Sequence, residues 1–480
     1  MMGAMAAAFD RKGEKAPSIV LKMLEELKHR ATAEPRVATQ PATYIAQFVK
    51  GSDDQALCSV VAVGSNNSEP VLGRDFSWIF EGRFFSPNAS VMDEIKHEMG
   101  QQPLKVSKCI LKDMDGSYTF GLAFREKIVV ARDALGTKPL YYGENESVYA
   151  VATERKALWK IGISNAYSLP PGNLVTIGES GFHFEPVAKI ESAVSMKIGM
   201  EEAAGQLQRL LLLSTKKRVA DARAVAVAFS GGLDSAVIAS LANSAGANVK
   251  LVWVGLEGQD EIDLARNAAE ILELPFFVRT YTIADVERTL SKVLWLVEEA
   301  DVMKAGVAIP FFWVAETASN LKYDVLLAGQ GADELFGGYQ RYLTDYEQGG
   351  VKKLEESLHR DVVTSYETNF QRDEPVCAFH KVDLRLPFVD SEVVRFSLSL
   401  PASLKIESAR DELRKRILRQ VARNLGIPSS IANRPKKAVQ FSSGVDKALK
   451  LLANKKGFAQ RSYIESVFKQ IYPNSGVHRP

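Results

Sequence analysis

The stretch VAVAFSGGLDSAVIAS, residues 225–240, joins an apolar run of β type, a turn with two adjacent glycines and an apolar run of helical type. A strand, a glycine turn and a helix in this order can cradle a pyrophosphate, because the first turn of a helix points unpaired N–H groups at an anion. The glycines allow close approach of the backbone, and the flanking serine hydroxyls add donors. The residues expected to bind nucleotide phosphate are therefore Ser230, Gly231, Gly232, Leu233 and Ser235.

Asp234 lies inside this loop, where its negative charge would repel a phosphate unless a cation lay between them. Mg²⁺ is the simplest cation to expect, since it binds few carboxylates together with phosphate oxygens. The loop matches neither G-x-x-x-x-G-K-S/T nor G-x-G-x-x-G, so it is not one of those two phosphate-binding motifs. An ordinary glycine turn between a strand and a helix is the competing interpretation.

Beyond residue 200, runs of β type alternate with helical patterns, which predicts a doubly wound α/β domain with a parallel sheet. The expected strands are VAVAF (225–229), KLVWVGL (250–256), FFVRTYT (276–282) and YDVLLAG (323–329). The expected helices cover about 201–218, 235–245, 260–272, 283–300 and 308–320. Ligands of such sheets lie at the carboxyl ends of the strands, so Gly255 at the end of the second strand is also assigned to nucleotide binding.

The first 190 residues contain short β runs separated by turn residues, with helical patterns only at about 17–30 and 91–100. The β runs are CSVVAVGSNN (58–67), SWIFEGRFF (77–85), SYTFGLAF (117–124), KIVVARDALG (127–136), VYAVAT (148–153) and NLVTIG (173–178). Many antiparallel strands with few helices predict an α+β sandwich of antiparallel sheets. We expect one domain at 1–190, a second at 200–465, and a loose tail at 466–480.

The composition is that of a globular protein, with 60 basic and 58 acidic residues and a net charge of +2. This balance gives no electrostatic reason to expect nucleic acid or a membrane as the main partner. No stretch approaches the roughly 20 apolar residues of a membrane span, and we expect a cytoplasmic protein. The three cysteines are widely separated, so neither a disulfide framework nor a zinc site is indicated.

A second glycine-rich loop, GQGADELFGGY at 329–339, follows the fourth expected strand. Its Asp333 is the candidate for a second magnesium ligand, because two aspartates at neighbouring strand ends could bridge cations to a phosphate chain. Gly329 and Gly331 are assigned to nucleotide binding. A helix-capping role for Asp333 is the competing interpretation.

Two later segments contain further candidates. KVDLRLPFVD (381–390) is strongly patterned and contains Asp383. NRPKKAVQFSSGV (433–445) places Lys436 and Lys437 in a loop with a proline, from which a lysine could reach the departing pyrophosphate. A solvated surface pair is the competing interpretation of the two lysines.

In this order, the four segments resemble the synthetase domain of the asparagine synthetase B family. The family runs S-G-G-x-D-S, S-G-E-G-S/A-D-E-x-F-G-G-Y, V-E-x-R-x-P-F-L-D and R-x-K-x-x-F-S-x-G-V, and this chain has SGGLDS, AGQGADELFGGY, VDLRLPFVD and RPKKAVQFSSGV. The resemblance implies a PP-loop ATP pyrophosphatase that uses ATP and Mg²⁺ to adenylate a carboxylate, after which an amine displaces AMP. The catalytic roles it implies fall on Asp234, Asp333, Lys436, Gln330 and Asp383.

The first half resembles the other domain of the same family, an N-terminal-nucleophile (Ntn) glutaminase. VARDALGTKPLYYG (130–143) is similar to its A-R-D-x-x-G-x-K-P-L-Y-Y, and ATERKALW (152–159) to its A-S-E-x-K-A-L. A glutaminase of this kind attacks the amide with an N-terminal cysteine. Counted back from the matching Phe9-Asp10, that position falls on Gly3, or on Met2 with one insertion.

The residues that support glutaminase chemistry are also replaced. The family's H-R-G-P-D reads HRATA at 29–33, and its N-G-E-I-Y reads EGRFF at 81–85. Loss of a nucleophile typically costs on the order of 10⁴-fold or more in rate. We therefore expect a retained glutaminase-like domain without glutaminase activity, and free ammonia as the nitrogen donor.

Two departures concern the substrates. Gln330 stands where asparagine synthetases usually have a glutamate beside the incoming ammonia, and a neutral amide can position a group but cannot act as a base. After Asp301, VMKAGVAIP replaces the family's V-T-T-I-R-A-S-T-P, so hydroxyls and an arginine expected near aspartate are missing, and Lys304 could compensate. Aspartate is nevertheless the acid that the resemblance favours.

Three alternatives stay open. One is an amide-forming synthetase or cyclase of the β-lactam synthetase type, which shares the fold and also carries an inactive glutaminase domain. The second is a non-catalytic nucleotide-binding regulator, and the third is a tRNA-modifying PP-loop enzyme, which the absence of a basic face disfavours. The assemblies to consider are a homodimer and a complex with a separate glutaminase.

Overall fold

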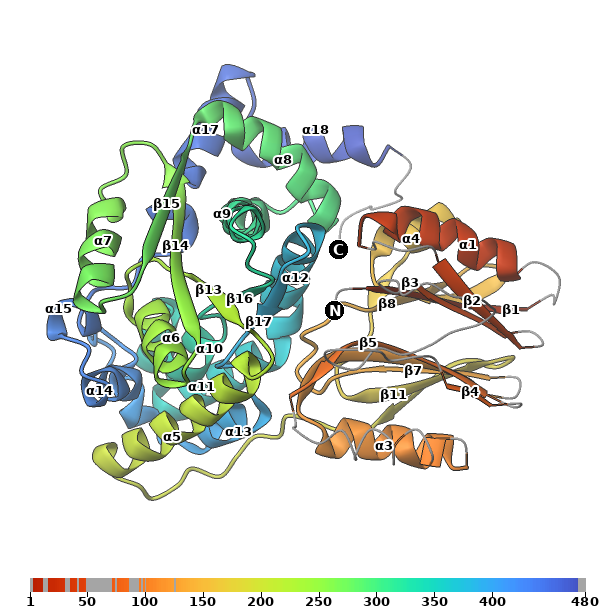
Figure 1. Ribbon diagram of the computed structural model, residues 1–480, viewed down its shortest axis with the longest axis horizontal. Coiled ribbons are helices and arrows are strands. Elements are labelled where there is room, and N and C mark those ends of the chain that lie inside the picture. The colour runs from red at the N-terminus through yellow and green to blue at the C-terminus, as the bar shows by residue number, and fades with distance from the viewer. Residues whose placement is uncertain are drawn as a thin grey trace. The chain divides into compact units, whose positions relative to one another are not determined.

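The computed structural model of the protein describes residues 3–11, 16–30, 35–40, 43–48, 71–73, 76–85, 95, 98–99, 101–124 and 127–473 (Figure 1). Contacts divide the chain into two compact units, one with the residues up to Lys189 and the chain from Tyr472, the other with Ile190–Ile471. The β run predicted at 58–67 lies outside the described residues, as does most of the helical pattern predicted at 91–100.

The first unit is built from short strands and few helices. Its elements are β1 (Ala4–Asp10), α1 (Ala16–Leu27), η1 (Lys28–Arg30), β2 (Pro35–Gln40), β3 (Thr43–Phe48), β4 (Val71–Gly73), β5 (Phe76–Phe84), α3 (Pro103–Asp113), β6 (Gly116–Phe124), β7 (Lys127–Arg132), β8 (Tyr141–Glu144), β9 (Val148–Ala152), α4 (Arg155–Lys160), β10 (Tyr167–Ser168), β11 (Asn173–Gly178) and β12 (Gly181–Pro186).

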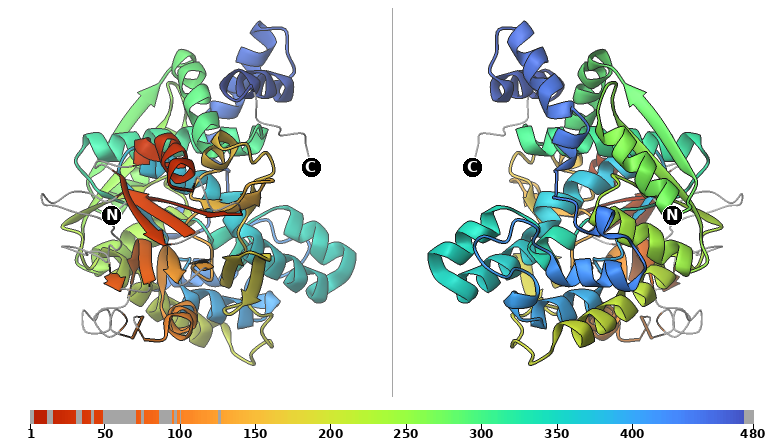
Figure 2. Two further views of the ribbon diagram at one scale, coloured as in Figure 1. Left: turned by 90° about the vertical axis from the view of Figure 1, so that its right-hand side faces the viewer. Right: turned by 90° about the vertical axis from the view of Figure 1, so that its left-hand side faces the viewer.

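These strands form two six-stranded sheets, in the orders β10-β8-β9-β1-β3-β2 and β12-β11-β7-β6-β5-β4. The paired strands run antiparallel. Side chains alternate along β1: Met5, Ala7 and Phe9 pack into the core between the sheets, while the intervening alanines pack against α1 and α4. Figures 1 and 2 show the resulting layers, with α1 and α4 outside one sheet and α3 outside the other.

The second unit alternates strands with helices and ends in helices. Its elements are α5 (Met200–Val219), β13 (Ala224–Ala228), α6 (Leu233–Ser244), β14 (Asn248–Leu256), α7 (Glu261–Ile271), β15 (Phe276–Tyr281), α8 (Ile283–Val297), α9 (Val302–Asn320), β16 (Val325–Leu327), α10 (Ala332–Phe336), α11 (Arg341–Ser365), the π-helix η2 (Tyr366–Phe370), α12 (Gln371–Phe379), β17 (Asp383–Arg385), α13 (Ser391–Ser399), η3 (Ala402–Leu404), α14 (Arg416–Asn424), α15 (Ser429–Ala432), α16 (Val439–Ser442), α17 (Val445–Lys455) and α18 (Gln460–Ile471).

The five strands form one parallel sheet in the order β15-β14-β13-β16-β17. Helix α6 packs on β13 and β14, and α9 packs on β14 and β16. Figure 1 shows these two helices on opposite sides of the sheet. The predicted fold class is therefore confirmed: antiparallel sheets in the first unit and a doubly wound parallel sheet in the second. Order reverses between β13 and β16, and ligands of such folds bind at a switch of this kind.

Three details differ from the sequence-based expectations or go beyond them. Helix α9 begins at Val302 rather than near 308, because the Asp301 carboxylate accepts a hydrogen bond from the Lys304 amide and caps it. Helix α18 continues to Ile471, past residue 466 where a tail is predicted. Cys109 is exposed on α3 and Cys377 is buried in α12. Within the described part of the chain, no helix is long and apolar enough to cross a membrane.

Candidate active site

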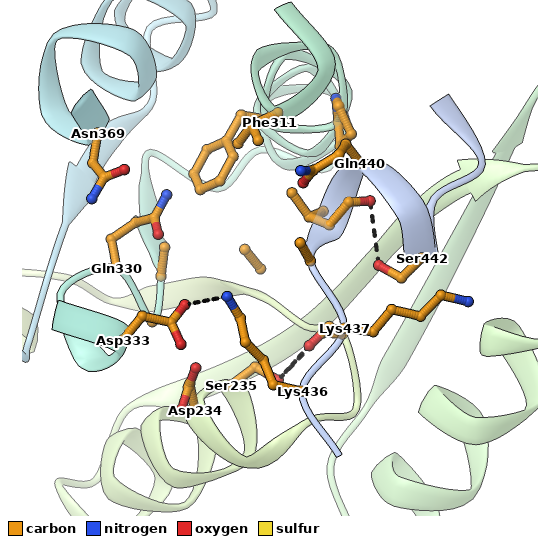
Figure 3. A pocket seen from close by; sticks show the side chains of 18 of the residues that line it. Asp234, Ser235, Phe311, Gln330, Asp333, Asn369, Lys436, Lys437, Gln440 and Ser442 are labelled. Carbon is orange, nitrogen blue, oxygen red and sulfur yellow. Dashed lines mark hydrogen bonds and ion pairs between the residues drawn. The ribbon is translucent and has the colours of Figure 1, made fainter. Parts of the chain in front are cut away.

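A cavity of about 310 Å³ opens in the second unit at the carboxyl ends of the parallel strands. Its walls come from the segments that follow β13 and β16, from β14 and α9, from the stretch between α10 and α12 together with those two helices, and from residues 436–442. The described lining includes the predicted residues Ser230, Asp234, Ser235, Gly329, Gln330, Asp333, Lys436 and Lys437. Figure 3 shows these segments converging on one space. Two loops more than ninety residues apart in sequence thus face the same cavity.

The first loop has the geometry that its glycines predict. Gly231 has a φ of +71°, and a Cβ there would come within 2.7 Å of the Ala265 Cα, so no other residue fits without a shift. Gly232 is the N-cap of α6 and donates to the Ser230 Oγ at 3.3 Å. The Oγ atoms of Ser230 and Ser235 lie 3.3 Å apart. Amide groups and hydroxyls therefore gather at one helix N-terminus, as a phosphate requires.

The second loop lies directly beside the first. A Cβ on Gly329 would be 3.0 Å from the Asp234 Cβ. Gly331 has a φ of +92° and Gly337 a φ of +74°, which place the one-turn helix α10 between two left-handed residues. A Cβ on Gly338 would lie 1.8 Å from the Asp333 Oδ1. The glycines of this loop therefore leave room for the Asp333 carboxylate.

Asp234 and Asp333 share one buried ammonium group. The Lys415 Nζ lies 2.6 Å from the Asp234 Oδ2 and 2.7 Å from the Asp333 Oδ1, and its side chain is only 3% exposed. The Lys436 Nζ approaches Asp333 from the cavity, 2.7 Å from its Oδ2. Figure 3 shows Lys436 directed at Asp333 and Lys437 directed away from it. Two carboxylates and two ammonium groups thus form one cluster at the cavity wall.

The charges of this cluster shift the pKa of each aspartate differently. Burial would raise the pKa of Asp333, but the Lys415 and Lys436 ammonium groups outweigh it and lower that pKa to about 2. Burial raises the pKa of Asp234, and Lys415 opposes this only in part. Burial would lower the pKa of Lys415, but the two carboxylates raise it. Asp333, with two ammonium partners, is therefore the more firmly charged of the pair.

Lys415 was not among the residues predicted from the sequence. It lies in ELRKRILRQ, where basic residues are frequent and none stands out. Both Arg414 and Lys415 have a φ of 50°, a left-handed conformation that is uncommon outside glycine. Such backbone strain often accompanies a functional position, and here it delivers the ammonium group to the aspartates.

Some predicted residues do not reach the cavity. Asp383 lies on β17, where its Oδ2 accepts a hydrogen bond from the Arg385 Nε at 2.8 Å, and it is not among the lining residues. Gly255 lies on β14 next to the lining residue Val254, and a Cβ there would meet the Trp253 ring at 2.5 Å. Leu233 begins α6 with a buried side chain, so only its backbone could serve a phosphate.

Comparison with known proteins agrees with these observations. The asparagine synthase family model matches residues 206–349 and 343–472. The chain belongs to the asparagine synthetase family. This is a family of ATP-dependent carbon–nitrogen ligases. A glutamine amidotransferase domain model also matches residues 91–160, in the first unit.

The relatives of this family are similar over most of the chain. A protein of Methanocaldococcus jannaschii, named as an asparagine synthetase of the glutamine-hydrolysing type, is 34% identical over 73% of this chain and 73% of its own length. Asparagine synthetase 3 of Arabidopsis thaliana is 27% identical over 69% of this chain, and the root enzyme of Pisum sativum is 26% identical over 69%. The chain spans 59% and 58% of the length of these two plant relatives.

Solved structures match less closely. The glutamine phosphoribosylpyrophosphate amidotransferase of B. subtilis has a TM-score of 0.31 at 16% identity, covering 57% of this chain and 65% of its own. The NMN synthetase of Francisella tularensis has a TM-score of 0.29 at 14% identity, covering 59% of this chain and 99% of its own.

Proposed function

We propose that this protein is an ATP-dependent amidoligase that adenylates a carboxylic acid, releases pyrophosphate and transfers the acyl group to ammonia. The observation that carries the proposal is the pair of carboxylates, Asp234 and Asp333, which share one cation beside a phosphate-binding loop. The triphosphate of ATP would lie along the loop at Ser230–Ser235, on the N-terminus of α6. The apolar residues of β13, β14 and α9 that line the cavity would cover the nucleoside.

The two aspartates also fit Mg²⁺. The structure already places one cation, the Lys415 ammonium, within hydrogen-bond distance of both carboxylates. Among the described residues no group of three or more His, Cys, Asp and Glu side chains could hold a metal by itself. Magnesium usually binds one or two carboxylates plus substrate phosphates, so two aspartates suffice. Bound there, it would neutralise charge on the pyrophosphate as it departs.

The lysines of the cluster supply fixed positive charge for adenylation. When the substrate carboxylate attacks the α-phosphorus, charge develops on the phosphate oxygens, and preorganised donors stabilise it. Lys436 faces the cavity and is 24% exposed, so its ammonium group can exchange Asp333 for a phosphate oxygen. Lys437 instead pairs with Glu261, which supports giving this role to Lys436. We therefore assign the phosphate contact to Lys436.

The first unit supports the use of ammonia in place of glutamine. Gly3 precedes β1, no residue from 3 to 11 is a cysteine, and Gly3 accepts a hydrogen bond through its carbonyl from the Arg30 Nε at 3.0 Å. Glu81 stands where the family has the asparagine of its oxyanion loop, and it is 2% exposed. A carboxylate at that position would repel an oxyanion, which needs hydrogen-bond donors. We infer that this unit no longer hydrolyses glutamine.

Aspartate is the first acid to test. Purified protein with Mg-ATP and aspartate is expected to release pyrophosphate and form asparagine when ammonium is added, and not when glutamine is added. Product formation from glutamine at a rate matching that from ammonium would refute the loss of glutaminase activity. If pyrophosphate is released with another acid but not with aspartate, the proposed amidoligase activity holds and that acid is the substrate. Nucleotide binding without release for any acid would favour a regulator.

A further inference from the structure

Two amide side chains line the cavity next to the aspartates, Gln330 after β16 and Asn369 in η2. The Gln330 Nε2 donates to the Asp373 Oδ2 at 2.5 Å, and the Asn369 Nδ2 donates to the Glu334 Oε1 at 2.8 Å. Figure 3 shows Gln330 between Asp333 and Asn369 in that view. In each case a carboxylate holds the NH₂ of the amide: Asp373, which is not among the lining residues, holds Gln330, and Glu334, which lines the cavity itself, holds Asn369.

The charge of Asp373 determines which way the Gln330 amide faces. Asp373 is 0% exposed, and the Arg372 guanidinium donates to both of its oxygens, from Nε at 2.7 Å and from Nη2 at 2.8 Å. A carboxylate held in this way can only accept hydrogen bonds, so the amide must turn its NH₂ toward it. The Gln330 carbonyl oxygen then faces away from Asp373. This orientation follows from chemistry and does not depend on distinguishing oxygen from nitrogen in the amide.

Asn369 is oriented by the same logic. The Glu334 Oε1 that accepts from Asn369 also accepts from the Tyr339 hydroxyl at 2.5 Å, so two donors point at one oxygen. The Asn369 carbonyl is therefore the free end of its amide. Asn369 belongs to the π-helical turn between α11 and α12, and such turns are frequent at functional sites.

We propose that Asp373 is a positioning residue for amide transfer, because it fixes the Gln330 carbonyl toward the cavity, where this oxygen and the Asn369 carbonyl accept N–H hydrogen bonds from the incoming nitrogen nucleophile. The inference rests on the proposed function. Two acceptors and no added charge suit a small N–H donor such as ammonia. Its nitrogen lone pair forms the bond to the acyl carbon, the bond from that carbon to the AMP oxygen breaks, and one proton passes to water or to the AMP phosphate.

The test separates the two half-reactions. Exchange of labelled pyrophosphate into ATP reports adenylation, and asparagine formation at limiting ammonium reports amide transfer. For Asp373→Asn we expect roughly tenfold slower amide formation, about the value of one hydrogen bond, with exchange changed less than about twofold. The KM for ammonium should rise more than kcat falls, since the lost contact binds the nucleophile. Equal losses in both half-reactions would overturn the positioning role.

A pair of exchanged residues tests the contact directly. Gln330→Glu places a carboxylate against that of Asp373 and should reduce amide formation by roughly 10²-fold. The double variant Q330E/D373N restores a donor facing an acceptor and should recover at least tenfold over Q330E. Simple addition of the two single effects would overturn the proposal. Asp221→Asn is the matched control, because it removes a partner of the buried Arg385 outside the cavity and should leave the two half-reactions in their wild-type ratio.

Failure of the inference and failure of the proposed function look different. Suppose the wild-type protein exchanges pyrophosphate into ATP, but Asp373→Asn slows both half-reactions equally. Adenylation would then be supported, and only the positioning role of Asp373 would be refuted. Absence of exchange in the wild-type protein with aspartate and every other acid tried would overturn both.

Discussion

Each unit contains a cluster of buried acids and bases, and the two clusters differ in their access to solvent. In the first unit, Glu154 contacts Arg30, His29 and Lys156, and Glu81 lies beside Arg30. The acidic and Arg or Lys side chains of that cluster are 0–2% exposed. In the second unit, Asp234 and Asp333 are 23% and 17% exposed and face a cavity.

Access to solvent distinguishes an ion cluster that stabilises the fold from one that can take part in a reaction. The acidic, Arg and Lys side chains around Glu154 are almost fully buried and pair with one another. The cluster around Asp333 holds similar groups but faces the cavity, and under the proposed function a phosphate or a metal ion would replace one of its lysine contacts. Removing a partner should therefore cost stability in the first unit and activity in the second.

The largest effect is expected from Asp234→Ala. Loss of this carboxylate removes one of the two proposed magnesium ligands and leaves Lys415 with one partner fewer. Pyrophosphate release should fall by roughly 10³-fold or more, since metal and electrostatic contributions of several kcal/mol are lost. The measurement is release of pyrophosphate at saturating Mg-ATP. Asp263→Asn, at an exposed position on α7, serves as the control and should retain the wild-type rate. If Asp234→Ala keeps a rate within tenfold of wild type, the proposed role of Asp234 in adenylation is wrong.

The next effect concerns stability in the first unit. Glu154→Gln removes the carboxylate that contacts both Arg30 and Lys156 and leaves Arg30 with the more distant Glu81, and breaking such a buried pair costs about 3 kcal/mol. The free energy of unfolding is measured in urea, with unfolding monitored by hydrogen exchange of the β9 amides. Glu185→Gln breaks the exposed pair with Lys108 and should change stability by less than about 1 kcal/mol. Similar losses of stability in both variants would mean that the buried cluster stabilises the protein no more than an exposed ion pair does.

Lys415→Met is expected to have an intermediate effect on stability, and this effect should depend on Mg²⁺. Without its ammonium group, Asp234 and Asp333 repel each other, and the free energy of unfolding should fall by about 2 kcal/mol in the absence of Mg²⁺. Added Mg²⁺ should recover part of this loss and raise the melting temperature more in the variant than in wild type. An equal response of both proteins to Mg²⁺ would contradict a shared cation position.

The smallest expected effect is the pH dependence that Glu154 contributes. Burial would raise its pKa, but the charges of His29, Lys156 and Arg30 hold that pKa well below the ordinary 4.5. A depressed folded-state pKa stabilises the protein above the unfolded value and loses this stabilisation as pH falls toward the folded value. Wild type should therefore lose stability below about pH 4.5 more steeply than Glu154→Gln. Parallel acid denaturation curves would contradict this assignment.

The sequence predicts most of the second unit because its strands are apolar runs and its loops carry glycines with a definite chemical purpose. It does not predict β1, since AMAAAFD has no β-branched residue and becomes a central strand only through burial on both faces. Lys415 cannot be predicted from the sequence, because it lies in a basic segment in which no pattern distinguishes one residue from the others. The pairing of Gln330 with Asp373 depends on the tertiary fold, which no local spacing reveals.

The most direct test of the central claim follows an oxygen atom. Aspartate labelled with ¹⁸O in its side-chain carboxylate is incubated with Mg-ATP, ammonium and the protein, and the AMP is examined by mass spectrometry. Attack of the carboxylate on the α-phosphorus predicts that AMP acquires a labelled oxygen and that asparagine retains the other. Unlabelled AMP, or ADP and phosphate as the products, would contradict an acyl-adenylate and with it the proposed function.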